Sequence, residues 1–382
     1  MKATVKPEML RWARERAALT LDTLAQRMHV QPDRVENWEQ SGALTLKQLE
    51  RLAKSTYTPV GYLFLQEPPV EQLPIPDLRT VGNRGIGHPS PNLLDMIHIC
   101  QQRQAWYRDY LRADGASPKD FVGLVNVGAN VVRTAQAMRE RLDFDLDARR
   151  RLPTWADALR QFIEQADAAG ILVMCSGVVR NNNKRRLDPQ EFRGFAMADP
   201  LAPLVFINGA DSKAAQMFTL AHELAHIWAG ESAVSDIDAR VEPSNRIEQW
   251  CNQVAAELLV PIAVLQEHIQ TGGVLIHEVA RLARQFKVSS LVILLRMFES
   301  GRLTRPVFQR EYEAELERLR ARKGSGGDFY LTQAARAGKR FARALVADTL
   351  EGRTLYRDAL QLLGISKVET FHELGRSLKF RV

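Results

Sequence analysis

The stretch MFTLAHELAHIW, residues 217–228, constrains the fold of this chain more than any other segment. It predicts an apolar helix that carries His222, Glu223 and His226 in its middle. At about 100° per residue, His226 lies about 40° and Glu223 about 100° around the helix from His222. The aliphatic residues cluster at about 140–200° and are Leu220, Leu224 and Ile227. We therefore expect the aliphatic side to pack against a sheet and the histidines to face something else.

Short apolar segments before this helix predict a small sheet. ILVMCSG, FRGFAMADP and APLVFING are typical of strands bounded by proline and glycine, and an amphipathic helix ending at Gly170 precedes them. Asp211 or Ser212 can cap the histidine-bearing helix, and Gly230 can end it. The order of elements predicts an α+β domain over residues 153–300, in which the sheet leads directly into the helix.

The spacing of the two histidines suits a metal ion. Residues at i and i+4 lie about 6 Å apart along a helix, so His222 and His226 can bind one Zn²⁺ at about 2.0–2.1 Å from each nitrogen. Glu223 cannot easily reach the same ion, but it can take a proton from a water that the ion activates. A chance HExxH is expected on the order of 0.01 times in such a chain. The motif therefore predicts metal-assisted hydrolysis.

A catalytic zinc takes three protein ligands and leaves a fourth position for water. No third histidine follows His226 closely, so an acidic residue must supply the third ligand. The candidates are Glu231, Asp236, Asp238, Glu242 and Glu248. SNRIEQWCNQVAAELLVP predicts a helix capped by Ser244, with Glu248, Asn252 and Ala255 on one face. Glu248 is favoured because the small alanine permits close approach to the histidine helix, where Asn252 can support a ligand by a hydrogen bond.

FTLAHELAHIW and EQWCNQVAAELLVP together resemble the ImmA/IrrE metallo-endopeptidase family, whose pattern is an HExxH helix followed by an ExxAN-x-FAA-x-LLMP helix. The resemblance spans residues 155–300. It implies a zincin-like, gluzincin-type endopeptidase that uses zinc, with manganese as the alternative ion. The implied metal ligands are His222, His226 and Glu248, and the implied general base is Glu223. Cys251 and Val254 replace the usual alanine and phenylalanine, which leaves the ligand set intact.

The same resemblance implies a function. Members of the family resemble regulators that cleave a transcription repressor in phage, mobile-element or stress circuits. A zincin commonly binds its substrate as an added strand, and a strand near Val205 is the candidate here. The alternative is a non-catalytic DNA-binding regulator or antitoxin-like protein that uses the zincin fold as a binding platform, with a toxin as partner. The intact Glu223 favours catalysis, because a structural metal site needs no base.

Residues 1–66 predict an all-helical domain. The pattern LxxLAxxxxVxxxxVxxWExSG resembles the Xre-type helix-turn-helix family, with Trp38 and Glu39 at the place of its WE-x-G signature. In that family the third helix reads the DNA major groove. Here that helix is partly acidic, and the side chains suited to DNA are Gln26, Arg34 and Asn37. DNA binding and a protein-interaction or structural role are equal alternatives for this domain.

Composition suggests the remaining boundaries. Residues 67–152 begin with a proline-rich linker and continue as bridging helices. Residues 301–382 predict a basic helical module that a Gly-rich break near residue 325 divides, with 17 Lys+Arg against 10 Asp+Glu from residue 302 onward in a chain of net charge +7. A basic stripe at helical spacing consists of Arg336, Lys339, Arg340 and Arg343. It suits phosphate or an acidic protein groove, and a solvated face is the plainer interpretation.

The overall composition predicts a globular protein. Of the 382 residues, 45% are hydrophobic and 25% are charged, which is enough to form a sizeable core and exposed surface. No apolar run approaches the roughly 18 residues of a membrane helix, and the first residues lack the core of a signal peptide. We therefore expect a soluble cytoplasmic protein. Cys100, Cys175 and Cys251 form no CxxC pattern and are expected to be free, buried thiols.

Overall fold

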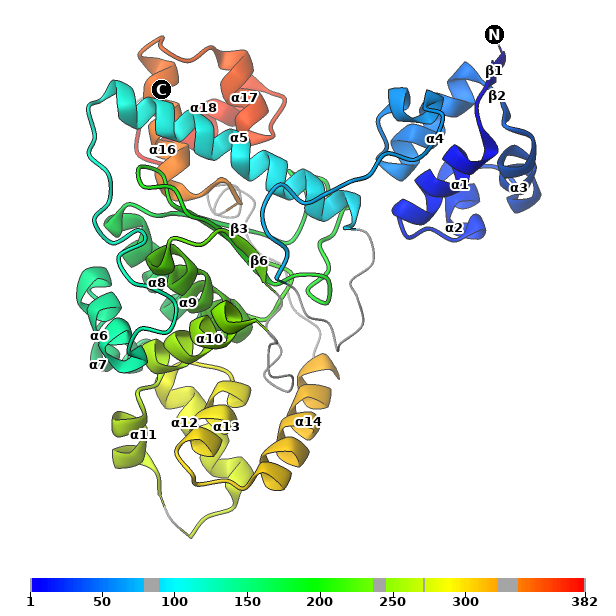
Figure 1. The fold of residues 1–382 in the computed structure, drawn as a ribbon. Coiled ribbons are helices and arrows are strands. Elements are labelled where there is room, and N and C mark those ends of the chain that lie inside the picture. Colours follow the sequence, from blue (N-terminus) through cyan, green and yellow to red (C-terminus); the bar gives the residue numbers. More distant parts are fainter. Residues whose placement is uncertain (1, 79–88, 236–244, 271, 322–335, 381–382) are drawn as a thin grey trace. The chain divides into compact units, whose positions relative to one another are not determined.

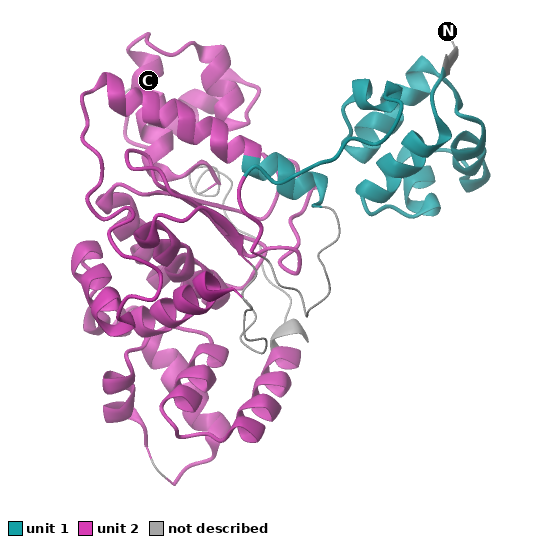
Figure 2. Cartoon of the chain, viewed as in Figure 1, with its two compact units in different colours: residues 1–74, 86–97 teal, residues 75–85, 98–382 magenta. Residues whose placement is uncertain are grey.

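The computed structural model of the chain describes residues 2–78, 89–235, 245–270, 272–321 and 336–380. Two compact units are distinguished (Figure 2); their residues are 1–74 with 86–97, and 75–85 with 98–382. Within the described ranges, no helix has both the length and the apolar composition that crossing a membrane requires. The predicted Gly-rich break near residue 325 lies outside these ranges.

The first unit is a small helical bundle with a two-stranded antiparallel sheet. Its elements are β1 (Lys2–Thr4), α1 (Pro7–Arg16), α2 (Leu21–Met28), α3 (Pro32–Ser41), β2 (Ala43–Thr45), α4 (Leu46–Thr56) and the 3-10 helix η1 (Val60–Phe64). Trp38 is buried, and the carboxylate of Glu39 accepts two hydrogen bonds from Arg14 at 2.6 and 2.9 Å. This buried ion pair joins α3 to α1, so Glu39 has a structural role in this unit.

The side chains proposed for DNA contacts are on the surface of this unit. Gln26, Arg34 and Asn37 are exposed, and the Arg34 guanidinium lies 5.9 Å from the centre of the Trp38 ring. Asp33 and Glu36 are exposed on the same helix α3. These carboxylates would repel the phosphates of DNA. DNA binding by this unit stays a prediction.

The second unit contains a four-stranded sheet in the order β3-β5-β4-β6 (Figure 1). Its strands are β3 (Leu172–Ser176), β4 (Gly194–Met197), β5 (Leu204–Asn208) and β6 (Ala233–Ser235). β3 and β5 are parallel, and β4 runs antiparallel to β5 and β6. The three predicted strands are confirmed. β6, which follows the histidine helix, is a strand that the sequence did not indicate.

The expectation that one of the strands near Val205 binds substrate stays a prediction, and β5 itself is not available for it. Val205 lies in β5, which is hydrogen-bonded to β3 on one side and to β4 on the other, so no edge is free there. β6 lies at the end of the sheet, and residues of the same unit already pair with its outer edge. Val234 N donates to Pro76 O at 2.9 Å, and Leu78 N donates to Val234 O at 3.1 Å.

Helices cover both faces of the sheet (Figure 1). α8 and α9 pack on one face, while α16 and the part of α5 after Ile97 lie on the other. The helices that follow η1 in the chain, whether or not they touch the sheet, are α5 (Pro91–Ala113), α6 (Val131–Leu142), α7 (Leu146–Arg150), α8 (Trp155–Ala169), α9 (Lys213–Ala229), α10 (Arg246–Leu259), α11 (Ile262–His268), α12 (Leu275–Phe286), α13 (Ser290–Glu299), α14 (Arg305–Ala321), α16 (Lys339–Leu350), α17 (Tyr356–Leu363) and α18 (Val368–Ser377).

The predicted basic stripe is only partly exposed. Gly338, with φ of 82°, separates Arg336 from α16 and breaks the expected helical spacing. The arginines donate to groups of the same unit, namely Arg336 to Asn181 Oδ1, Arg340 to Asp167 O and Arg343 to Leu378 O. Lys339 pairs with Glu164 at 3.2 Å. Arg336 and Arg340 therefore join the C-terminal helices to the rest of the unit, while the Arg343 bond stays within those helices. Lys339 and Arg343 are exposed, as the solvated interpretation expects, and phosphate binding stays a prediction.

Candidate metal centre

Helix α9 places the HExxH residues in the interior. Ser212 caps it by accepting a hydrogen bond from Ala215 N at 3.2 Å, and Gly230 ends it in the left-handed region at φ 74°, as the sequence predicts. Every side chain from residue 216 to residue 228 is buried. His222, Glu223 and His226 are all 0% exposed. A polar group with this degree of burial requires a partner or a bound ligand.

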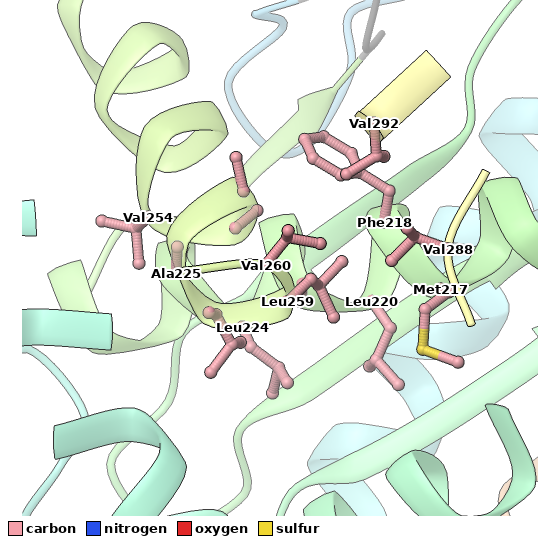
Figure 3. Packing of buried hydrophobic residues seen from close by; sticks show 14 of the residues in the cluster. Met217, Phe218, Leu220, Leu224, Ala225, Val254, Leu259, Val260, Val288 and Val292 are labelled. Atoms are coloured by element: carbon pink, nitrogen blue, oxygen red, sulfur yellow. The ribbon is translucent and has the colours of Figure 1, made fainter. Parts of the chain in front are cut away.

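The aliphatic side of α9 lies within a large hydrophobic cluster (Figure 3). Leu220 and Leu224 pack there together with Leu259 and Val260. The sheet meets α9 at Glu223, because a Cβ built on Gly194 of β4 would lie 2.9 Å from Glu223 Oε1. This contact corrects the expectation that the polar side of the helix faces away from the sheet.

Helix α10 brings an acid to the two histidines. It begins after Asn245, whose side chain accepts from Ile247 N at 2.8 Å, so the cap is Asn245 and not the predicted Ser244, which lies outside the described residues. Glu248 stands in the first turn and is 2% exposed. Cys251 and Ala255 are completely buried. These small residues permit the close packing of α10 on α9.

Three arginines hold the other end of α10. Arg139 donates to Glu257 O at 2.8 Å, and Arg296 donates to Val260 O at 2.8 Å. Arg149 donates to Leu259 O at 3.5 Å. Cations at a helix C-terminus satisfy its unpaired carbonyls and its negative end. They therefore fix the helix that carries Glu248.

The three candidate ligand side chains, here called the triangle, meet through four atoms, because each imidazole faces a different oxygen of Glu248. His226 Nε2 lies 3.1 Å from His222 Nε2 and 3.1 Å from Glu248 Oε1, and His222 Nε2 lies 3.2 Å from Glu248 Oε2. A tetrahedral zinc ion with bonds of about 2.0–2.1 Å holds its ligands about 3.3 Å apart. The residues therefore fit three of the four ligand positions of a divalent zinc site.

Electrostatics favours the protonation states that a metal ion requires. Burial opposes ionisation of Glu248, but the charges and hydrogen bonds of His222 and His226 outweigh it and lower the Glu248 pKa to about 2. Burial also lowers the pKa of His226, which favours the neutral ring. His222 Nδ1 donates to Asn252 Oδ1 at 2.9 Å, which leaves the Nε2 lone pair free for an ion. Asn252 lies where the sequence placed it.

Glu223 stands beside this triangle, close to the Ser235 hydroxyl. Among the described residues, none makes a hydrogen bond of good geometry to either of its carboxylate oxygens. Burial, and then the negative charge of Glu248, raise the Glu223 pKa well above its usual range, against a smaller lowering by the Ser235 hydroxyl. A buried carboxyl group left in this state is suited to exchange a proton with a small molecule bound next to it.

This raised pKa predicts a pH effect on the metal-free protein. The folded state keeps the Glu223 proton to a higher pH than the unfolded chain, so this contribution to stability is complete below pH 4.5 and is lost as pH rises through the folded pKa. Each unit of the difference corresponds to about 1.4 kcal/mol. We expect metal-free Glu223→Gln to unfold at a higher temperature than wild type at pH 8. Calorimetry with Glu231→Gln as exposed control checks this, and equal melting temperatures would contradict it.

The structure also adds and excludes residues. Glu231 is exposed and is not one of the grouped ligand side chains, although its N–H donates to His226 O at 3.0 Å and its charge acts on His226. Asp236, Asp238 and Glu242 lie outside the described residues. Ser235 of β6, which the sequence did not indicate, is 0% exposed, and its hydroxyl lies 3.4 Å from His226 Nε2 and 3.3 Å from Glu248 Oε1. Gly194 was likewise missed, since only strand pairing places it against Glu223.

Comparisons with known proteins agree with this site. The family described as the IrrE N-terminal-like domain matches residues 166–298, and a domain of unknown function matches residues 337–377. The radiation response metalloprotease IrrE of Deinococcus radiodurans is 34% identical over 107 residues, which are 26% of this chain and 32% of that protein. The chain thus matches about a third of the relative's length. Residues 166–298 thus resemble the IrrE N-terminal-like domain, and the His-His-Glu triangle within them is compatible with a divalent metal ion.

Proposed function

We propose that the protein is a zinc-dependent endopeptidase that cleaves a regulatory protein, and that this protein is a transcription repressor. The observation that carries the proposal is a single arrangement. The Nε2 atoms of His222 and His226 lie 3.1 Å apart, and each lies 3.1–3.2 Å from a different oxygen of Glu248. The buried carboxyl group of Glu223 lies beside them without a hydrogen bond of good geometry among the described residues. A purely structural site needs the triangle but has no use for the carboxylate.

The roles of the residues follow from their positions. His222, His226 and Glu248 hold the ion, which would supply a Lewis acid that polarises the peptide carbonyl and lowers the pKa of water. Glu223 takes the proton from the attacking water and passes it to the departing amine nitrogen. Asn252 keeps the His222 ring in the tautomer that offers Nε2. The dry surroundings of the site strengthen each of these interactions.

A protein substrate is supported by the name of the relative and by the additional unit. The IrrE of Deinococcus radiodurans is described as a radiation response metalloprotease. The first unit of the present chain resembles a repressor-type helix-turn-helix domain and offers a second surface for a partner. We place the substrate in a phage, mobile-element or stress-response circuit on this basis.

The test combines metal analysis with cleavage of candidate repressors encoded by neighbouring genes. Wild type and Glu223→Gln should each hold one zinc by mass spectrometry, and only wild type should cleave, because loss of a general base costs about 10²–10⁴-fold in rate. Glu231→Gln, an exposed glutamate past the end of α9, should cleave like wild type.

Two other outcomes would overturn the proposal. Equal cleavage by wild type and Glu223→Gln would show that Glu223 is not the general base. Zinc in the wild type together with a stable, uncleaved partner complex would favour the antitoxin-like or scaffold alternative.

A further inference from the structure

We propose that Ser235 is a positioning residue for the metal ligand Glu248, an inference that rests on the proposed zinc site. The Ser235 hydroxyl donates to Glu248 Oε1 at 3.3 Å and lies 3.4 Å from His226 Nε2. Both side chains are nearly or completely buried. The Ser235 hydroxyl also interacts with the Glu223 carboxyl group, which therefore competes with Glu248 for its single proton.

The fold holds Ser235 from two sides. Its strand β6 pairs with β4 in a register that places Ser235 opposite Gly194, and Ser235 O accepts from Arg193 N at 3.3 Å. The neighbouring Val234 bonds through both its N–H and its carbonyl to residues 76–78. Because successive side chains alternate between the faces of a strand, Ser235 points to α9 while Val234 points away from it. Strand β6 thus holds the Ser235 hydroxyl next to Glu248 and His226.

A hydroxyl in a fixed position can orient the Glu248 carboxylate, which otherwise rotates about its Cγ–Cδ bond. The Glu248 oxygens each face one imidazole, at 3.1 Å for Oε1 and 3.2 Å for Oε2. A proton donated to Oε1 takes one lone pair and limits this rotation, so that the remaining lone pairs point between the imidazoles. Ser235 would do for Glu248 what Asn252 does for His222.

The experiment measures zinc affinity by competition with a chromophoric chelator, which needs no substrate. Ser235→Ala should bind zinc about 10–100-fold more weakly than wild type, the usual cost of losing a hydrogen bond to a ligand. Ser235→Thr and Ser235→Val have the same shape and differ in the hydroxyl, so the threonine variant should bind more tightly than the valine variant. Ser232→Ala is the matched control, because Ser232 accepts from Ala198 N at 2.9 Å and touches no ligand.

The outcomes separate this inference from the proposed function. Equal affinities of wild type and Ser235→Ala, or of the threonine and valine variants, would overturn the role of Ser235 and leave the endopeptidase proposal standing. A wild type that binds no zinc would overturn both. Circular dichroism of each metal-free variant shows whether it is folded, and the threonine–valine comparison decides the matter if the alanine variant is not.

Discussion

Glu248→Gln is expected to lose zinc. The substitution keeps the volume of the side chain but removes the negative charge that the pKa of about 2 maintains at every physiological pH. Two neutral imidazoles and a weak amide ligand then remain. We expect the affinity to fall by more than about 100-fold, because losing a hydrogen bond to a ligand already costs about 10–100-fold. Cleavage should be lost together with the metal.

Mass spectrometry of the purified protein and chelator competition measure this effect. Glu231→Gln is the matched control, because the sequence offers Glu231 as a candidate third ligand and the structure places its side chain on the surface. That variant should keep one zinc per chain. Wild-type affinity in Glu248→Gln would contradict the ligand set, and zinc loss in Glu231→Gln would indicate that another acid binds the ion.

The helical parts of the candidate site were predictable from the sequence because their signals are local. Helix α9 has a serine cap, a closing glycine and an i, i+4 histidine pair, all within 20 residues. The three strands before it are short apolar runs between glycines and prolines. Glu248 could be favoured among five acids only by helix geometry and family resemblance, and the fold supplies the distances.

The sheet contributes to the site through long-range pairing, which sequence periodicity does not report. β6 has three residues, too few to show alternation, so Ser235 carried no signal. For the same reason the sequence did not show that Val205 lies in an inner strand, which the order β3-β5-β4-β6 places between two others. The predicted helical spacing of the basic stripe is wrong at Arg336 for a related reason, because Gly338, with its positive φ, interrupts a helix that looks continuous in the sequence.

Gly194→Ala is expected to abolish most cleavage while keeping zinc. The glycine has an ordinary φ, so only space is at issue. Its new Cβ would lie 2.6 Å from Thr219 Cγ2, 2.9 Å from Phe206 O and 2.9 Å from Glu223 Oε1. The backbone of β5 cannot yield, and the Glu223 carboxylate is the most flexible of the three neighbours. It should therefore move, and a displacement of about 1 Å in a catalytic group can cost 10²-fold in rate.

Three measurements distinguish this effect from a loss of fold. Gly194→Ala should keep one zinc, since the ligand triangle does not touch it, and should lose about 1–3 kcal/mol of stability from overpacking. Adding Thr219→Ser removes the methyl at 2.6 Å, so part of the lost stability should return. The contact with Phe206 O keeps the rest of the loss, and cleavage stays low because the contact with Glu223 persists. Gly273→Ala, which meets no atom within 4 Å, should behave as wild type. If Gly194→Ala cleaved at the wild-type rate, the position of Glu223 against β4 would have no part in catalysis.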